Sequence, residues 1–160
     1  MAAPLKNTHE LDPTDRRLLQ ALALDARRSG KELAALTGVA ESTVSQRLRG
    51  LRDSGVVRGY RTELNLAAVG LPLEAVIAVR LSTHTRKHVD SFRAKAAQMP
   101  GVLAVFHVAG ANDYLLHVAV SDAAALKDFV LEQLATHPAV AHTETSIVFE
   151  HTLGRSPLEI

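Results

Sequence analysis

The side chains best suited to chemistry lie between positions 41 and 53, in a stretch that combines hydroxyl, amide and guanidinium groups. Val44, Leu48 and Leu51 are spaced four and three residues apart, which predicts a helix with one buried side. The rest of its surface presents Ser42, Thr43, Ser45, Gln46, Arg47 and Arg49. Near a helix N-terminus such groups can hydrogen-bond base edges and phosphates in a DNA major groove. The same pattern also fits the solvated face of an ordinary helical hairpin.

Two further helices are predicted before this one. Ser29 followed three residues later by Glu32 is a capping box, which marks a helix start. Gly38 then stands where the chain must turn with a positive φ. An earlier helix is predicted to begin at Asp12, an N-cap acid followed by a proline and by a second acid at the third helical position. Three helices, the last two joined by a glycine turn, form a helix-turn-helix domain.

The charge of the chain is divided unevenly between its two halves. The formal net charge is +1, but residues 1–62 carry a net +4 and residues 63–160 a net −3. The basic half is therefore the helical half. Between positions 41 and 61 there are five arginines and only two acids, which favours contact with phosphates. Such an asymmetry suggests a nucleic-acid module joined to a module with another role.

Composition bounds the class of protein. Apolar residues make up 47% of the 160-residue chain, enough for packed cores, and the chain has no cysteine. Disulfides, thiolate metal sites and cysteine nucleophiles are thereby excluded. The first ten residues have no apolar core of a signal peptide, and no apolar run reaches the length of a membrane span. We expect a soluble, cytoplasmic protein.

The second half of the chain alternates strands and helices. Residues 56–64 have strand character, and from Leu73 the apolar residues recur at every second position. The predicted elements are a strand at 73–81, a helix at 87–99, strands at 102–109 and 114–120, a helix at 123–136 and a strand at 139–150. This βαββαβ order predicts a sheet with both helices on one face. Because the other face is also apolar, we expect the domain to dimerise or oligomerise through it.

Four short motifs stand in a characteristic order. They are Gly38-Val39-Ala40, Val44-Ser45-Gln46-Arg47-Leu48, Gly55-Val56-Val57-Arg58-Gly59-Tyr60 and Gly110-Ala111-Asn112-Asp113-Tyr114. In this order and spacing, over about residues 11–150, the chain resembles the Lrp/AsnC (feast/famine) transcription regulators. The resemblance implies a dimer, or a ring of dimers, that binds promoter DNA through paired helix-turn-helix domains. Its C-terminal domains would bind a small effector, usually an amino acid, between subunits. Many members have Ser where Ala40 stands.

The resemblance also implies where the effector binds. It places the effector-binding residues at Gly110, Ala111, Asn112, Asp113, Thr143, Thr145 and Ser146. From the residues alone, 110–113 is first of all a hairpin turn, because Asn and Asp tolerate left-handed backbone. Its N–H groups could receive a carboxylate and Asp113 an ammonium, which would suit a zwitterion.

Seven of the eight histidines follow residue 63, but no group of His, Asp and Glu has the spacing of metal ligands. His107 and His117 are predicted on paired strands with Ala109 opposite Tyr114, which places the two histidines on opposite faces of the sheet. We therefore expect no metal site and no cofactor other than the small effector.

The expected organisation is an α+β chain in which a three-helix helix-turn-helix domain is joined to a ferredoxin-like βαββαβ domain. Its predicted parts are a flexible arm at 1–10, the DNA-binding domain at 11–62, a linker at 63–72, the effector-binding and oligomerisation domain at 73–150, and a tail at 151–160.

Three classes of function compete. The first is a sequence-specific DNA-binding transcriptional regulator, not an enzyme, whose DNA binding or assembly responds to an amino acid. It would bind double-stranded promoter DNA as a homodimer, formed through the C-terminal domain, that assembles into a tetramer or octamer. The second is an architectural, nucleoid-type DNA-binding protein without an effector. The third is an enzyme resembling the siroheme decarboxylases; the stretch 58–63 counts against it, since it has arginines but no histidine.

Overall fold

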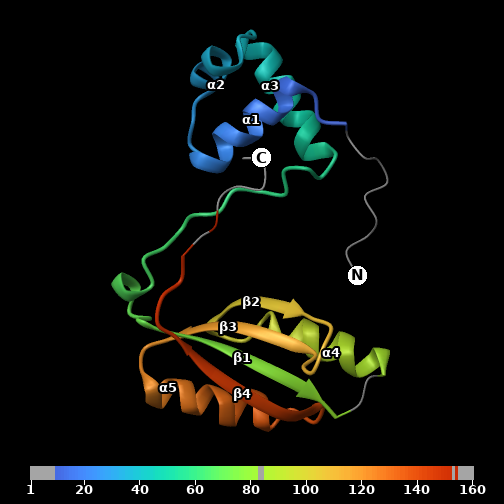
Figure 1. The fold of residues 1–160 in the computed structure, drawn as a ribbon, viewed down its shortest axis with the longest axis vertical. Helices are drawn as coiled ribbons and strands as arrows, with labels where there is room; N and C mark the ends of the chain where they lie inside the picture. The colour runs from blue at the N-terminus through green and yellow to red at the C-terminus, as the bar shows by residue number, and fades with distance from the viewer. Residues whose placement is uncertain (1–9, 83–84, 153, 155–160) are drawn as a thin grey trace. The chain divides into compact units, whose positions relative to one another are not determined.

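The computed structural model describes residues 10–82, 85–152 and 154. The chain divides into two compact units, one reaching to Thr62 and the other running from Glu63 to Thr152 (Figure 1). Each unit has a hydrophobic core of its own. The predicted arm, apart from Glu10, and most of the predicted tail lie outside the described residues. No helix among the described residues is long and apolar enough to cross a membrane.

The first unit is a three-helix domain. Its helices are α1 (Pro13–Leu24), α2 (Gly30–Thr37) and α3 (Glu41–Asp53). The predicted capping box of Ser29 with Glu32 at the start of α2 and the predicted N-cap at Asp12 are confirmed. Asp12 also forms a capping box with Asp15 at the start of α1. The turn between α2 and α3 passes through Gly38 at φ 73°. By contrast α3 begins at Ala40 without a side-chain cap.

A small aliphatic core holds these helices together. Its buried members are Leu18 and Ala21 of α1, Leu33 of α2 and Val44 of α3. Leu51 is also fully buried, and Leu48 packs partly against the core, so the predicted buried stripe of α3 is confirmed. The polar side of α3 consequently faces away from this core.

The segment after α3 departs from the prediction. The chain leaves the helix through Gly55 at φ 76°, and the Val57 N–H donates to the Leu51 carbonyl at 2.9 Å. The strand character predicted for residues 56–64 is wrong, because this segment forms no strand. A strand needs a neighbour that exchanges backbone hydrogen bonds with it. None of the described strands pairs with these residues.

The second unit has the predicted βαββαβ order. A single helical turn, η1 (Ala67–Val69), precedes it. The elements are β1 (Leu73–Leu81), α4 (Arg86–Ala96), β2 (Val102–His107), β3 (Tyr114–Val120), α5 (Ala123–Asp128), its π-helical continuation η2 (Phe129–Ala135) and β4 (Val140–Val148). The strands form one sheet in the order β2-β3-β1-β4, with antiparallel neighbours. This is the predicted ferredoxin-like arrangement.

Both helical segments cover the same face of the sheet. Alternate residues of the central strands, such as Ile77 and Leu116, are fully buried. They form one core with Phe92 of α4 and with Leu126 and Phe129 of α5 and η2. Because successive strand residues point to opposite faces, the residues between them lie on the other side, which we call the open face.

The pairing of β2 with β3 differs from the predicted register. His107 lies opposite Tyr114, where the sequence predicted Ala109. The error comes from the connection, which spans the six residues 108–113 instead of the four of a short hairpin. A shift of two residues preserves the faces. His107 and His117 therefore lie on opposite faces, as predicted.

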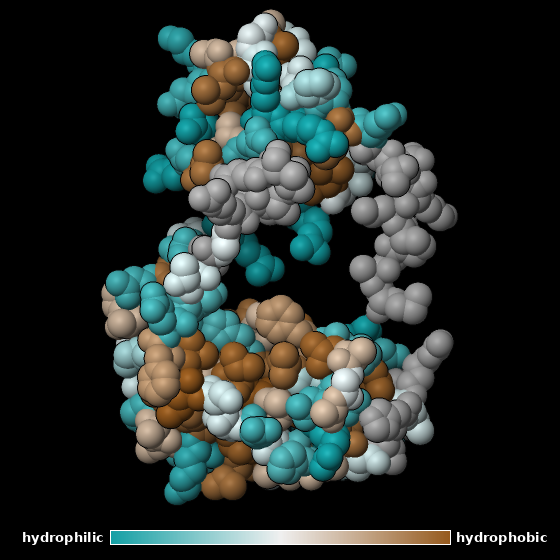
Figure 2. Space-filling view, viewed as in Figure 1, coloured by the Kyte–Doolittle hydropathy of each residue, from teal (hydrophilic) through white to brown (hydrophobic). Residues whose placement is uncertain are grey.

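The open face of the sheet carries apolar side chains. Val76 and Ala78 of β1 and Leu115 of β3 are half-buried there, and Phe106 of β2, opposite Leu115, is 53% exposed. Figure 2 shows apolar side chains gathered on the viewed side of this unit. The predicted apolar character is confirmed for the centre of this face, whereas Glu74, Arg80 and His117 and the β4 residues His142, Glu144 and Ser146 make its remainder polar.

Candidate DNA-binding surface and effector loop

The outward side of α3 presents most of the predicted DNA-contacting side chains. Ser42, Ser45, Gln46 and Arg49 are exposed, and Thr43 and Arg47 are half-buried on one flank. The helix is fixed from below by Val44 and Leu51. A rigid helix with an exposed polar and basic side, preceded by a short helix and a tight turn, is the geometry by which a recognition helix enters a major groove.

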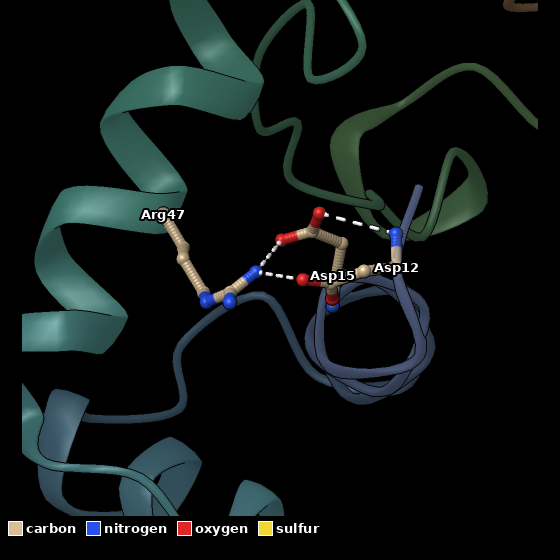
Figure 3. A network of polar contacts seen from close by, with 3 residues as sticks. All are labelled: Asp12, Asp15 and Arg47. Atoms are coloured by element: carbon tan, nitrogen blue, oxygen red, sulfur yellow. Dashed lines mark hydrogen bonds and ion pairs between the residues drawn. The ribbon is translucent and has the colours of Figure 1, made fainter. Parts of the chain in front are cut away.

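Arg47 has a partner that the sequence did not predict. Its Nη1 donates to Oδ2 of Asp12 at 2.6 Å and to Oδ1 of Asp15 at 3.0 Å (Figure 3). The two aspartates were interpreted only as caps of the first helix, a role that they also have. Arg47 thus joins α3 to the start of α1. The guanidinium predicted to contact DNA therefore also has this structural role.

The electrostatics of this network favour the charged forms of Asp12 and Arg47. The Asp15 N–H and then the Arg47 guanidinium hold the pKa of Asp12 below its ordinary value. The carboxylates of Asp12 and Asp15 in turn raise the pKa of Arg47. No local spacing could reveal these contacts, because Arg47 is 35 residues from Asp12 and 32 from Asp15.

The predicted effector loop connects β2 to β3 at the end of β1. Gly110 has φ 138°, and it is exposed together with Ala111, whereas Asn112 is half-buried. Within the part of the chain that the structure describes, the backbone N–H groups of Gly110, Ala111 and Asn112 donate no hydrogen bond to a backbone carbonyl. Three neighbouring amides of this kind can bind an anion such as a carboxylate.

Asp113 ties this loop to β1. Its N–H donates to the Val79 carbonyl at 2.9 Å, and its Oδ2 accepts from the Leu81 N–H at 2.8 Å. The Val108 N–H donates to the Asp113 carbonyl at 3.0 Å, which closes the loop. Part of the Asp113 carboxylate is therefore committed to the backbone of β1, and an ammonium group would share it with Leu81.

The predicted residues of β4 do not all lie on one face. Thr143 is opposite Val79 and Thr145 is opposite Ile77, so both threonines lie on the helix-covered face. Thr143 is at the same end of β1 as Asp113. Ser146, opposite Val76, lies on the open face. The structure thus brings the loop and Thr143 together around one strand end and separates Ser146 from them.

Tyr114, directly after the loop, is a packing residue. Its ring is fully buried, stacks on His107 at a centroid distance of 4.7 Å and contacts Phe92. Its hydroxyl donates to the Val89 carbonyl at 3.0 Å. Burial raises the pKa of Tyr114. This ring anchors the loop to the core.

Comparison with known families decides the assignment. The model of the AsnC-type helix-turn-helix domain matches residues 11–52, and that of the Lrp/AsnC ligand binding domain matches residues 74–158. The chain belongs to the Lrp/AsnC family. It is a DNA-binding transcriptional regulator of the helix-turn-helix type.

Individual members of the family are similar over nearly the whole chain. The HTH-type transcriptional regulator AldR of Mycolicibacterium smegmatis is 45% identical over 149 residues, which cover 93% of this chain and 87% of AldR. A transcriptional regulator of Neisseria meningitidis, solved as an L-Met complex, has a TM-score of 0.84 at 34% identity and covers 93% of this chain and 97% of its own. AsnC of E. coli has a TM-score of 0.80 at 25% identity, with 92% and 97% covered. These relatives favour the regulator over the architectural protein and the enzyme.

Proposed function

We propose that this Lrp/AsnC regulator binds promoter DNA through α3 and changes its DNA binding or assembly when a free amino acid occupies the β2–β3 loop. The observation that carries the proposal is the set of three loop amides beside a carboxylate at one end of β1. This pair of groups suits the carboxylate and ammonium of a zwitterion. The L-Met bound to the Neisseria meningitidis relative supports an amino acid as the class of effector.

The DNA contacts are proposed for the exposed side of α3. The hydroxyl and amide groups of Ser42, Thr43, Ser45 and Gln46 can exchange hydrogen bonds with base edges. Arg49 carries an exposed guanidinium suited to a phosphate or to guanine. Arg47 contributes by fixing α3 against α1 and by adding positive potential beside the groove.

We further propose that two copies pair through the open face of the sheet. Phe106 and the half-buried Val76, Ala78 and Leu115 give that face an apolar centre. A two-fold dimer would present two helix-turn-helix domains to two half-sites of an operator. Ser146, which lies on the open face, would then reach an effector only from the interface side. Dimers would assemble further into a tetramer or octamer.

The effector role is tested by Asp113→Asn. An asparagine oxygen still accepts from the Leu81 N–H, so the loop keeps its anchor, but the negative charge that would bind an ammonium is gone. The full chain is titrated with fluorescently labelled DNA from its own upstream region, with and without single amino acids. We expect the wild-type response to one amino acid to require on the order of ten times more of it in Asp113→Asn, the size of one charge-assisted hydrogen bond.

Asp128→Asn, an exposed acid at the end of α5, is the matched control and should respond like the wild type. A scrambled DNA at two salt concentrations separates specific from purely electrostatic binding. Equal binding to both DNAs, or no response to any amino acid in the wild type, would overturn the proposal.

A further inference from the structure

Two histidines and a glutamate meet on the open face, far from the effector loop. Glu74 stands near the start of β1, and His117 on β3 lies diagonally across from it, since His117 is opposite Val76. His151 follows β4, whose Val148 is opposite Glu74. Glu74 is about 20 Å along β1 from the Val79–Leu81 end that holds the loop, at 3.3 Å per residue.

The polar atoms of these three side chains converge on one point. Nε2 of His117 is 2.7 Å from Oε2 of Glu74, and Nδ1 of His151 is 4.0 Å from the same oxygen. One ligand atom from each residue lies within 4.8 Å of the other two. The two imidazoles meet edge to face, with ring centroids 5.4 Å apart.

The surroundings make this convergence unusual. The side chains of His117 and Glu74 are only 17% and 22% exposed, on a face whose neighbouring positions are apolar. Partly buried polar groups need good partners to offset the loss of water. A hydrogen bond between His117 and Glu74 supplies one such partner, and His151 brings a second imidazole to the same carboxylate oxygen.

We propose that Glu74, His117 and His151 form a binding site for a divalent transition-metal ion, with zinc as the best fit. Two imidazoles and one carboxylate are a donor set that zinc accepts, and three protein ligands leave one position for water. Ligand atoms on a tetrahedral zinc lie about 3.3 Å apart, as bonds of about 2.0–2.1 Å require. The separations of 2.7 Å and 4.0 Å lie on either side of that value.

The metal would fasten the segment that follows β4. His151 is 52% exposed and lies beyond the last paired residue of the strand, whereas Glu74 and His117 belong to the two central strands. Zinc binding would therefore connect this segment to the centre of the sheet and stabilise the second unit, because only the folded chain brings the three ligands together.

The test is isothermal titration of the metal-stripped full chain with zinc chloride, together with visible absorption of the cobalt(II) form. We expect one ion per chain, four-coordinate cobalt absorption and a rise in the unfolding temperature with zinc. His151→Gln should lower the zinc affinity by on the order of 100-fold or more, because loss of a supporting contact to a metal ligand already costs about 10–100-fold and this substitution removes a ligand itself. His117→Gln and Glu74→Gln should do the same.

His142→Gln is the matched control. His142 is an exposed histidine on β4 opposite Arg80, six positions along β1 from Glu74, and its loss should leave the zinc affinity unchanged. If a central-strand variant fails to fold, His151→Gln decides, since that side chain is exposed and outside every strand. Absence of stoichiometric zinc binding, or an unchanged affinity in His151→Gln, would overturn the proposal.

Discussion

Arg47 and Arg49 are two positions apart on α3 and carry the same charge, but the fold uses them differently. Arg47 is held by Asp12 and Asp15, whereas the side chain of Arg49 is exposed. We expect Arg49→Ala to weaken DNA binding and to reduce the salt slope of the affinity by about one unit, with no change in unfolding temperature. Arg47→Ala should weaken DNA binding and also lower the unfolding temperature by a few degrees, because the ion pairs that join α3 to Asp12 and Asp15 are then lost.

Fluorescence anisotropy at several salt concentrations and thermal unfolding by circular dichroism measure both quantities, and each variant serves as the control for the other. Equal unfolding temperatures in the two variants would show that the network of Figure 3 adds nothing to stability. Unchanged DNA affinity in both variants would contradict the placement of the DNA-contacting surface on this side of α3.

His137 gives the second unit a pH dependence of known sign. The side chain is buried against Phe92, and its Nδ1 accepts from the Ala139 N–H. Burial, with the positive charges of Lys95 and His88, holds the pKa of His137 below its ordinary value of 6.5. The unfolded chain therefore gains a proton before the folded chain does. The stability that the neutral, buried His137 contributes to the second unit is fully present above about pH 6.5. It is lost as the pH falls toward the pKa of His137 in the folded state.

We expect urea midpoints of the second unit to fall between pH 7 and pH 5 and the fall to be smaller in His137→Gln than in the wild type. The slope with pH is the readout, since the substitution can change the midpoint at every pH. His142→Gln, at an exposed position, should keep the wild-type slope. An identical slope in His137→Gln would contradict this origin of the pH dependence.

At the scale of the element, alanine substitutions at two glycines of the helix-turn-helix are expected to change stability in opposite directions. Gly38 has φ 73°, where a Cβ is strained, whereas Gly50 is inside α3 and a Cβ there would meet no atom within 4 Å. Gly38→Ala should destabilise the first unit by about 1 kcal/mol. Gly50→Ala should stabilise it by about 0.5–1 kcal/mol, because alanine loses less backbone freedom in a helix.

Urea denaturation followed through the helical signal, or hydrogen exchange of the α3 amides, reports both effects. The two substitutions add the same methyl group, so each controls for the other. Stabilisation by Gly38→Ala would contradict the backbone strain expected at φ 73°, and destabilisation by Gly50→Ala would contradict the gain expected from alanine at a helical position with open space.

The elements were predictable because their signals are local. The capping box at Ser29, the N-cap at Asp12, the turn at Gly38 and the alternation from Leu73 depend on residues within a few positions of one another, and all are confirmed. The register of β2 was missed by two residues because the length of an irregular connection leaves no periodic trace in the sequence. The strand predicted at 56–64 was wrong because a strand needs a neighbouring strand to exchange backbone hydrogen bonds with, and local residue types do not show whether such a neighbour exists.

The contacts between distant elements could not be predicted. Arg47 pairs with acids that precede it by more than 30 residues, and Glu74 meets a histidine 43 residues later. Each pair joins elements whose relative placement follows from the whole fold. For the effector loop, the sequence identified the turn itself, but the bonds from Asp113 to β1 required the structure.

At the scale of the whole molecule, the proposed pairing through the open face decides whether the chain is a monomer or part of an assembly. Phe106 on that face is 53% exposed, and Leu131 on η2 is 51% exposed. If the open face is the interface, Phe106→Glu places a charge in it and should yield monomers in analytical ultracentrifugation. Leu131→Glu, an equally exposed apolar position on a helix, should leave the assembly intact.

The same pair of variants connects assembly to DNA binding. A monomer presents one recognition helix, so it loses the gain in effective concentration that the second half-site gives, a factor of about 10²–10⁴. Phe106→Glu should therefore bind a two-half-site operator on that order more weakly than Leu131→Glu does, while both bind a single half-site equally. Monomers that keep the full operator affinity would show that one helix-turn-helix unit suffices. An intact assembly in Phe106→Glu would instead place the interface elsewhere on the chain. Dimerisation would then not explain why the centre of the open face is apolar.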